Sequence, residues 1–258
     1  MLRYRYLFEQ MVRRELRAKY KGSALGVVWY LVNPLVLMAV YAVLFSTLLG
    51  AVSIEDYPLF LFVGLIVWTF FSQSLLTAAT SLVDQASLVS KVRFPRETVP
   101  AAVVSVQLVP FLVLLVLVAP VAVIVRGTLH PALLLLVPVV VCLFAFALGL
   151  ALAVSVAHAH FRDVQPVLGA ALLPWFFVTP IFFRLQDLPG LSGHPAAEAL
   201  LRWGNPVAPF IEAVRAVLYD GAAPSAGTLV YVVAVAAAAL AGGLTLFRRL
   251  EGELAVVL

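Results

Sequence analysis

Long runs of apolar residues, separated by short polar segments, dominate the sequence. A helix of about 20 residues crosses the ~30 Å hydrocarbon core of a bilayer. Six apolar runs reach about this length, at residues 31–50, 58–82, 98–125, 132–157, 164–183 and 226–247. Strands that cross a membrane need only about ten residues of alternating polarity. The pattern therefore predicts an all-α integral membrane protein, a single domain over 1–258 with spans one to five within 31–183.

The first 23 residues follow a different pattern, in which apolar positions recur with helical spacing among basic ones. The apolar positions include Tyr4, Phe8, Leu16 and Tyr20. Much of the remaining surface is basic, at Arg13, Arg14, Arg17 and Lys21. This pattern is typical of an amphipathic helix that lies at the membrane interface. Two roles stay open for it: a basic anchor that fixes topology, or a docking helix that also touches a cytoplasmic partner.

Composition and charge strengthen the membrane interpretation. Hydrophobic residues make up 64% of the chain and charged residues 12%, and the mean hydropathy is +1.08, which is more apolar surface than a soluble domain buries. With six spans, 13 of the 17 lysines and arginines lie on the side of both termini. The others are Arg126, Arg184, Arg202 and Arg215. Because positive loops stay in the cytoplasm, we expect an inner-membrane protein with segment 1–23 and tail 248–258 cytoplasmic. The net charge of +4 then reflects topology, and no nucleic acid is expected as a partner.

Residues for energy conversion or metal chemistry are missing from the sequence. Phosphate-binding loops need Gly-x-x-x-x-Gly-Lys-Ser/Thr, but Lys19, Lys21 and Lys91 are the only lysines and none has this context. We therefore expect no cofactor in this chain, with ATP and Mg²⁺ on a separate ATPase if transport is ATP-driven. The single cysteine, Cys142, cannot form a disulfide within the chain. His158 and His160 point apart on a helix, so no metal site is predicted.

Two other functional classes are disfavoured by what the chain lacks. Ser192-Gly193-His194 resembles a fragment of the lipid-phosphate phosphatase signature. That chemistry also needs a Lys/Arg cluster and a second His activated by an Asp, which the other histidines do not supply. Ion-coupled carriers place ionisable groups mid-membrane, whereas the most polar residues inside the runs are Gln73 and Gln107.

Aromatic residues are frequent in and beside the first, second and fifth runs. They include Tyr30, Tyr41, Phe45, Trp175, Phe176 and Phe177. Many aromatics in membrane helices face lipid or lie at the interfaces. A subset lining a conduit would suit a sugar chain, because aromatic faces hold sugars weakly and so let a polymer slide. These six residues are therefore candidate conduit residues.

Several short motifs follow one another in an order that resembles a known family. They are residues 13–26 with Trp29 and Asn33-Pro34, then 64–68, Lys91-Val92-Arg93-Phe94-Pro95-Arg96, 161–164, 179–181 and Asn205-Pro206. Over residues 8 to about 253 the chain resembles the permease subunits of polysaccharide-type ABC exporters. These proteins export lipid-linked O-antigen, capsule or teichoic acid chains.

The resemblance implies an assembly and a set of functional residues. Two copies of the permease would pair around a conduit, and two copies of a separate ATPase would bind below them. The 84–96 loop would couple to the ATPase through Lys91, Arg93, Phe94, Pro95 and Arg96. For Arg162 and Asp163 two interpretations stay open: a part in coupling, or Asp163 as the cap of the fifth helix.

By the same resemblance, residues 184–225 form an outer segment of short re-entrant helices. Asn205 followed by Pro206 is a good helix start, and 206–219 is too short to span a bilayer. Glu212 and Arg215 are three residues apart, so they could pair and lower the cost of lying near the bilayer. They would either shape an outer gate or hold the hairpin together.

The prediction is thus a transport subunit without enzymatic activity. It would move a polyprenyl-diphosphate-linked polysaccharide or teichoic acid across the cytoplasmic membrane as a homodimer with its ATPase. A related permease for a drug or small lipid is the alternative. A membrane lipid-phosphate phosphatase is the alternative from a different class.

Overall fold

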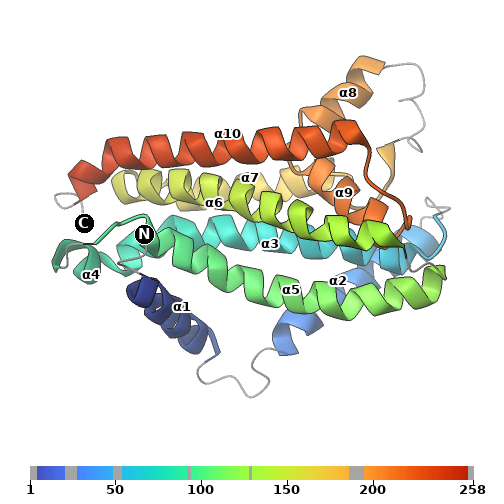
Figure 1. The fold of residues 1–258 in the computed structure, drawn as a ribbon, viewed down its shortest axis with the longest axis horizontal. Helices are drawn as coiled ribbons and strands as arrows, with labels where there is room; N and C mark the ends of the chain where they lie inside the picture. Colours follow the sequence, from blue (N-terminus) through green and yellow to red (C-terminus); the bar gives the residue numbers. More distant parts are fainter. Residues whose placement is uncertain are drawn as a thin grey trace.

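The protein is described by a computed structural model over residues 5–20, 28–48, 54–91, 94–127, 130–185 and 195–254. Within these ranges the regular secondary structure is entirely helical. The long helices run side by side as one bundle (Figure 1). The all-α prediction is confirmed.

Four long helices form the frame of the bundle. They are α3 (Tyr57–Asp84), α5 (Thr98–Arg126), α6 (Leu136–His160), which the 3-10 helix η3 (Pro131–Leu135) precedes, and α10 (Ala226–Leu250). In the described part of the chain, these four are long and apolar enough to cross a membrane. α3 lies at the centre, because 78% of its most apolar window is buried against 17% for α10. Most residues of α3 are apolar and buried, as a helix covered on nearly all sides requires.

Two shorter apolar helices occupy the first and fifth predicted runs. α2 (Val28–Ala42) continues as the π-helix η2 (Val43–Leu48), and α7 covers Val164–Val178. The prediction that the fifth run stays helical to residue 183 is wrong. Pro180 disfavours helical backbone at the residue before it, and Thr179 is accordingly extended, with φ −76° and ψ 137°. The chain therefore turns away from the bundle axis after Val178.

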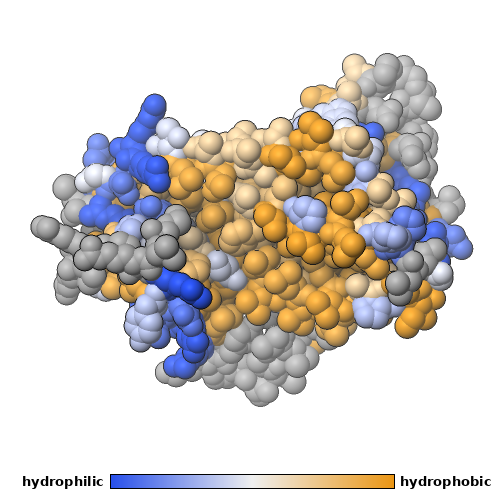
Figure 2. Space-filling view, in the orientation of Figure 1, coloured by the Kyte–Doolittle hydropathy of each residue, from blue (hydrophilic) through white to orange (hydrophobic). Residues whose placement is uncertain are grey.

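An apolar belt surrounds the middle of the bundle. Figure 2 shows hydrophobic residues over the middle of the molecule and hydrophilic residues gathered at both ends. Large apolar side chains on the outward faces of α5 and α10 are strongly exposed, with Val116 at 71% and Val230 at 69%. Contiguous apolar surface of this kind is unfavourable in water and matched by lipid. The belt is therefore the membrane-facing surface.

Different short elements cover the two ends of the bundle. One end, the α4 end, carries α1 (Arg5–Tyr20), α4 (Ala86–Lys91) and the 3-10 helix η5 (Glu251–Glu253) (Figure 1). The opposite end, the α9 end, carries α8 (Pro195–Trp203) and α9 (Ala208–Leu218). Both α8 and α9 come from the predicted outer segment, and α9 is almost wholly buried against the long helices.

α6 and α10 approach each other backbone to backbone. A methyl group on Gly149 would lie 2.3 Å from the carbonyl carbon of Ala239. A methyl group on Gly243 would lie 1.9 Å from the carbonyl oxygen of Gly149. Glycine is required at both positions, because a side chain would force the helices apart. Such close contact through small residues is a main source of helix association in membranes.

Gly243→Ala is expected to destabilise the protein, while Gly242→Ala next to it is not. At Gly242 a methyl group would meet nothing within 4 Å, so the change should gain a few tenths to about 1 kcal/mol of helix propensity. At Gly243 overpacking should cost roughly 1–3 kcal/mol instead. Thermal unfolding in detergent measures both variants. Equal melting temperatures would contradict the close contact.

Candidate functional site

At the α4 end, a hydrophobic cluster holds the loop after α4 against the bundle. Phe94 is only 9% exposed and packs in this cluster together with Met11 of α1 and Val89 of α4. Residues of α3, α5, α6 and α10 complete it, with Leu82, Val99, Val156 and Phe247 among them. The predicted coupling residue Phe94 therefore faces the bundle, where it joins α1 and α4 to the long helices.

Polar contacts tie the same loop to the end of the chain. Arg96 donates a hydrogen bond through Nη1 to the carbonyl oxygen of Glu251 in η5. His160, at the end of α6, lies with Nε2 3.4 Å from the Glu253 carboxylate. The loop, η5 and α6 are thus connected by side chains, and Arg96 is engaged within the chain.

Among the remaining predicted coupling residues, the exposure of Pro95, Arg162 and Asp163 is described. Arg162 and Asp163 are exposed in the turn between α6 and α7. Pro95 is half-buried, Lys91 is the last residue of α4, and Arg93 lies outside the described residues. The structure therefore separates the predicted set into the inward-facing Phe94 and Arg96 and the exposed pair at 162–163.

Asp163 does not cap the fifth helix with its side chain. It occupies the position before α7, but no hydrogen bond joins its carboxylate to the first turn. His158 of α6 takes this role, because its Nδ1 accepts a hydrogen bond from the backbone N–H of Gln165 at 3.3 Å. The capping hypothesis for Asp163 is wrong. The acceptor comes from the preceding helix across the tight turn.

α1 is helical, and the prediction of an amphipathic helix at its position is consistent with its exposure pattern. Met11 is 3% exposed and belongs to the cluster at the α4 end. Arg13, Arg14 and Arg17 are exposed, and Arg13 pairs with Glu9 at 2.6 Å. Lys21, predicted with them, lies outside the described residues. Gln85, just before α4, donates to the Glu15 carboxylate at 2.9 Å and so connects α1 to the coupling region.

At the α9 end, Arg215 is a buried cation whose partners are backbone carbonyls. It is 5% exposed, and it donates to the carbonyl oxygens of Phe60 at 3.2 Å and Ile181 at 2.6 Å, and to that of Pro180. Its guanidinium carbon lies 3.5 Å from the centre of the Phe60 ring. Gly64 leaves the room for it, since a methyl group there would lie 2.5 Å from Nη2. Arg215 thus joins α9 to α3 and to the turn after α7.

The expected Glu212–Arg215 pair is wrong. Glu212 makes its described ion pair with Arg202 of α8, at 3.0 Å. Spacing of three residues places two side chains on one face of a helix. Here, however, Arg202 of α8 pairs with Glu212, and backbone carbonyl groups bind the Arg215 guanidinium. Both predicted gate residues nevertheless line the same cavity of about 240 Å³ at the α9 end.

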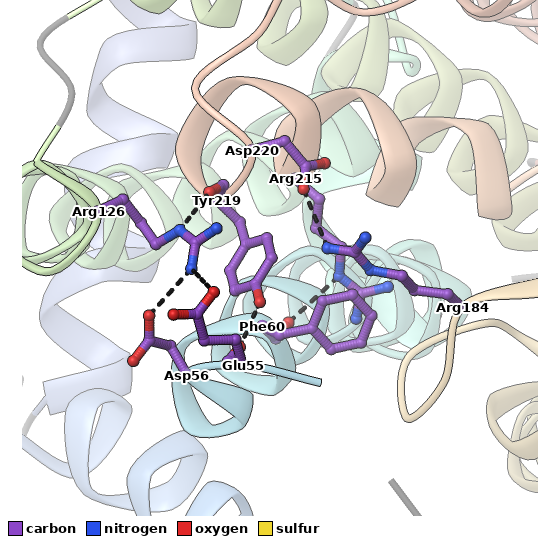
Figure 3. A network of polar contacts seen from close by, with 8 residues as sticks. All are labelled: Glu55, Asp56, Phe60, Arg126, Arg184, Arg215, Tyr219 and Asp220. Atoms are coloured by element: carbon purple, nitrogen blue, oxygen red, sulfur yellow. Dashed lines mark hydrogen bonds and ion pairs between the residues drawn. The ribbon is translucent and has the colours of Figure 1, made fainter. Parts of the chain in front are cut away.

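Arginine and aromatic side chains alternate across the α9 end (Figure 3). Tyr219 has the Arg126 guanidinium 4.8 Å from its ring centre and that of Arg184 at 5.3 Å. Arg184 also lies 5.6 Å from the centre of the Phe60 ring, whose closer neighbour is Arg215. Such cation–π contacts contribute about 0.5–2 kcal/mol each. We call this set the outer network; its members are Arg126, Tyr219, Arg184, Phe60 and Arg215.

Carboxylates complete the outer network. Arg126 pairs with Asp56 and Glu55, at 3.1 Å each, and Arg184 pairs with Asp220 at 3.0 Å. Tyr219 donates its hydroxyl hydrogen to the carbonyl of Glu55. The outer network thereby links the start of α3, the end of α5, the turn after α7 and the end of α9. Sequence reasoning found only Arg215, because the partners lie far apart along the chain.

Most of the predicted conduit aromatics meet in one cluster between α2, α3 and α7. Phe182 is its centre, with ring centroids of Tyr41, Phe45 and Phe176 at 4.9–5.0 Å. Phe177 is 49% exposed and stacks on Phe182. Trp175 donates through Nε1 to Asn205 at 3.0 Å. Tyr30 belongs to α2. The role of these residues in a conduit stays a prediction.

These features define a polytopic helical membrane protein with an apolar belt and a polar network at each end. The chain belongs to the ABC-2 type transporter family, to which residues 6–219 match. The resemblance to ABC exporter permeases is thereby confirmed.

Three relatives are similar over most of their length. The chain is 33% identical over 258 residues to the O-antigen export system permease protein RfbA of Myxococcus xanthus, covering 99% of this chain and 96% of the relative. It is 26% and 25% identical to two O-antigen export system permease proteins RfbA of Klebsiella pneumoniae. Each of these matches covers 77% of this chain and 80% of the relative.

Arg215→Met is expected to destabilise the protein by roughly 2–4 kcal/mol, because buried carbonyl groups lose their donor. Arg202→Met removes the half-exposed partner of Glu212 and should cost about 1 kcal/mol or less. Thermal unfolding of both variants in detergent tests the difference. Similar losses for the two would show that the carbonyl contacts contribute little.

Gly64→Ala offers a second test of the same contact. The added methyl group would collide with the Arg215 guanidinium, so this variant should lose stability although alanine favours helices. Gly169→Ala in α7 is the matched control, since its methyl group would meet only Leu76 at 3.9 Å. A stability gain for Gly64→Ala would contradict the close fit.

Proposed function

We propose that the chain is the membrane-spanning permease subunit of an ATP-driven exporter, which moves a lipid-linked polysaccharide of the O-antigen or teichoic acid class across the cytoplasmic membrane. The observation that carries this proposal is the similarity over 99% of the chain to an O-antigen export permease. The apolar belt and the polar ends support it. Family membership favours transport over the lipid-phosphate phosphatase, whose motif at 192–194 lies outside the described residues.

In the proposed topology the chain crosses the membrane six times, with α2–η2 as the first span and α7 as the fifth. Both termini and the α4 end then face the cytoplasm, because most lysines and arginines lie there and positive segments stay inside. The α9 end faces outward, and α8 and α9 are the short helices of the re-entrant outer segment. The outer network would hold this segment closed at the mouth of the conduit.

A separate ATPase would supply the energy, and ATP and Mg²⁺ would bind to it. Two permease copies and two ATPase copies form the proposed assembly. The ATPase would contact the exposed part of the α4 end, at Arg162, Asp163 and α4. Phe94 and Arg96 would pass its movement inward, because they connect the loop to α1, α10 and η5.

The conduit would lie between the two permease copies, where the aromatic cluster of α2 and α7 supports a path for sugars. The outward-facing Phe177 and the half-buried Tyr41 and Phe45 are the cluster members that a polymer would touch. Trp175 and Phe176 would lie behind these rings and support them without touching the polymer, since Phe176 is 8% exposed.

Purified alone, the chain should hydrolyse no ATP, whereas a complex with its ATPase should do so. Cells that lack the chain should accumulate lipid-linked polymer inside and lose it from their surface. Sustained hydrolysis by the chain alone would contradict the division of labour. Normal surface polymer combined with altered drug efflux would replace the polysaccharide with a small-molecule substrate.

Reversing both charges in Arg162→Glu with Asp163→Lys should reduce export by about tenfold or more, because like charges across an interface cost several kcal/mol. The pair is exposed, so the amount of protein in the membrane should not change. Arg248→Glu, also exposed at the α4 end, is the control. Unchanged export in the double variant would remove this turn from the ATPase contact.

A further inference from the structure

A cavity with several polar side chains in its wall lies between α1 and the pair α3–α5. Its volume is about 360 Å³, roughly ten times the volume of a water molecule in the liquid. α1 contributes Arg14, Glu15 and Lys19; α3 and its end contribute Thr77, Thr80, Ser81, Asp84 and Gln85; α5 contributes Val103, Val106 and Gln107. The conduit as proposed above does not use this cavity, and the predicted coupling loop 84–96 contributes only Asp84 and Gln85 to its wall.

The part of the cavity nearer the middle of the bundle is built from one cation and a chain of neutral polar groups. Lys19 donates through Nζ to the Gln107 side-chain oxygen at 2.5 Å, and Gln107 donates through Nε2 to the Thr77 hydroxyl at 3.1 Å. Thr77 lies two helical turns from Asp84, about 10 Å along α3. Burial lowers the pKa of the Lys19 ammonium to about 8. The Lys19 ammonium is thus partly buried at the α4 end and is held there by Gln107.

The acidic residues of the cavity stand at its other end. Glu15 is bound by Arg14 at 3.1 Å and by Gln85 at 2.9 Å, and Asp84 is exposed. The negative charge of Glu15 is therefore balanced locally. An anion that enters between α1 and α3–α5 would meet Lys19, Gln107 and the threonine hydroxyls.

The level of the cavity indicates the source of such an anion. An amphipathic helix that lies on a membrane is at the depth of the lipid headgroups. α1 forms one wall of the cavity and contributes the basic residues Arg14 and Lys19. The Thr77 hydroxyl donates to the carbonyl oxygen of Gln73, so the donors for an anion are the Lys19 ammonium and the Gln107 amide. Such donors suit phosphate oxygens, and charge-assisted hydrogen bonds to phosphate are strong. Lipid phosphates are the anions present in quantity at this depth.

We propose that this cavity binds the phosphate group of an anionic lipid that enters sideways between α1 and the α3–α5 pair, with Lys19 as its cationic contact. The lipid is either a bulk phospholipid or the diphosphate carrier of the glycan, and only the second source rests on the proposed function. In both cases Gln107 and Thr77 position the ammonium group.

Binding to the full-length chain in detergent tests the proposal, with farnesyl diphosphate and short-chain phosphatidylglycerol as probes. Lys19→Met should weaken binding of at least one probe by about tenfold or more, the loss expected for one charged hydrogen bond. Thr77→Val, which keeps the shape of the side chain, should weaken it less. Arg13→Met removes an exposed charge from the same helix and should leave binding almost unchanged. Equal losses for Lys19→Met and Arg13→Met, or no loss for either, would overturn the proposal.

The two probes distinguish the two sources. Preference for farnesyl diphosphate assigns the cavity to the carrier lipid, and preference for phosphatidylglycerol assigns it to bulk lipid. Export by the same variants separates this proposal from the proposed function. If the chain binds a probe through Lys19 but exports no glycan in cells, the phosphate site is supported and the proposed function in polysaccharide export is refuted.

The pH dependence of probe binding separates a lysine that contacts the phosphate from one that only stabilises the fold. Between pH 7 and 9 phosphatidylglycerol keeps its charge, while Lys19 loses its proton on passing a pKa of about 8. Among the described residues, the other charged groups that line the cavity are Arg14 and Glu15 of α1 and Asp84 of α3, and α5 contributes none. Binding should therefore weaken as pH rises, and Lys19→Arg should abolish this dependence because arginine stays charged. A pH profile shared by both proteins would overturn the proposal.

Discussion

Hydrocarbon does not tolerate polar groups without partners, and this constraint governs the arrangement of the whole chain. Backbone groups satisfy it by forming helices. Charged side chains satisfy it by lying at the ends of the bundle, where they pair with one another, as Arg126 does with Asp56 and Arg184 with Asp220. Arg215 is the instructive case, because it is buried and takes backbone carbonyls as partners. Its three acceptors lie in α3 and in the turn after α7, which the guanidinium joins to α9.

The bounds of the long helices could be predicted well because a single property, the length of an apolar run, determines them. α3 and α5 begin and end within two residues of their predicted runs 58–82 and 98–125. α7 was harder, since its run continues apolar to 183 while Pro180 ends the helix at Val178. Hydropathy does not register that interruption. A rule for the residue before proline would not have singled it out, because Pro110 and Pro120 lie inside α5 and Pro174 lies inside α7.

Side-chain partners were largely beyond prediction because they depend on contacts between distant segments. Spacing suggested that Glu212 meets Arg215, but only the fold brings Arg202 to the acidic residue and the carbonyl of Phe60 to the arginine. Lys19 and Gln107 are 88 positions apart and still form a hydrogen bond. Asp163 looked like a cap from its position, whereas His158 of the preceding helix supplies the acceptor. Composition identified the right residue types, and tertiary packing decided their partners.

The contact between Gly149 and Gly243 has a consequence for how such a protein can move. Two backbones that touch directly cannot slide past each other without a clash, nor separate without leaving a gap. α6 and α10 must therefore travel as one rigid pair. A change in shape that admits a bulky cargo then has to arise at contacts other than the one between α6 and α10. The two glycines thus make α6 and α10 the part of the bundle against which other helices would have to move.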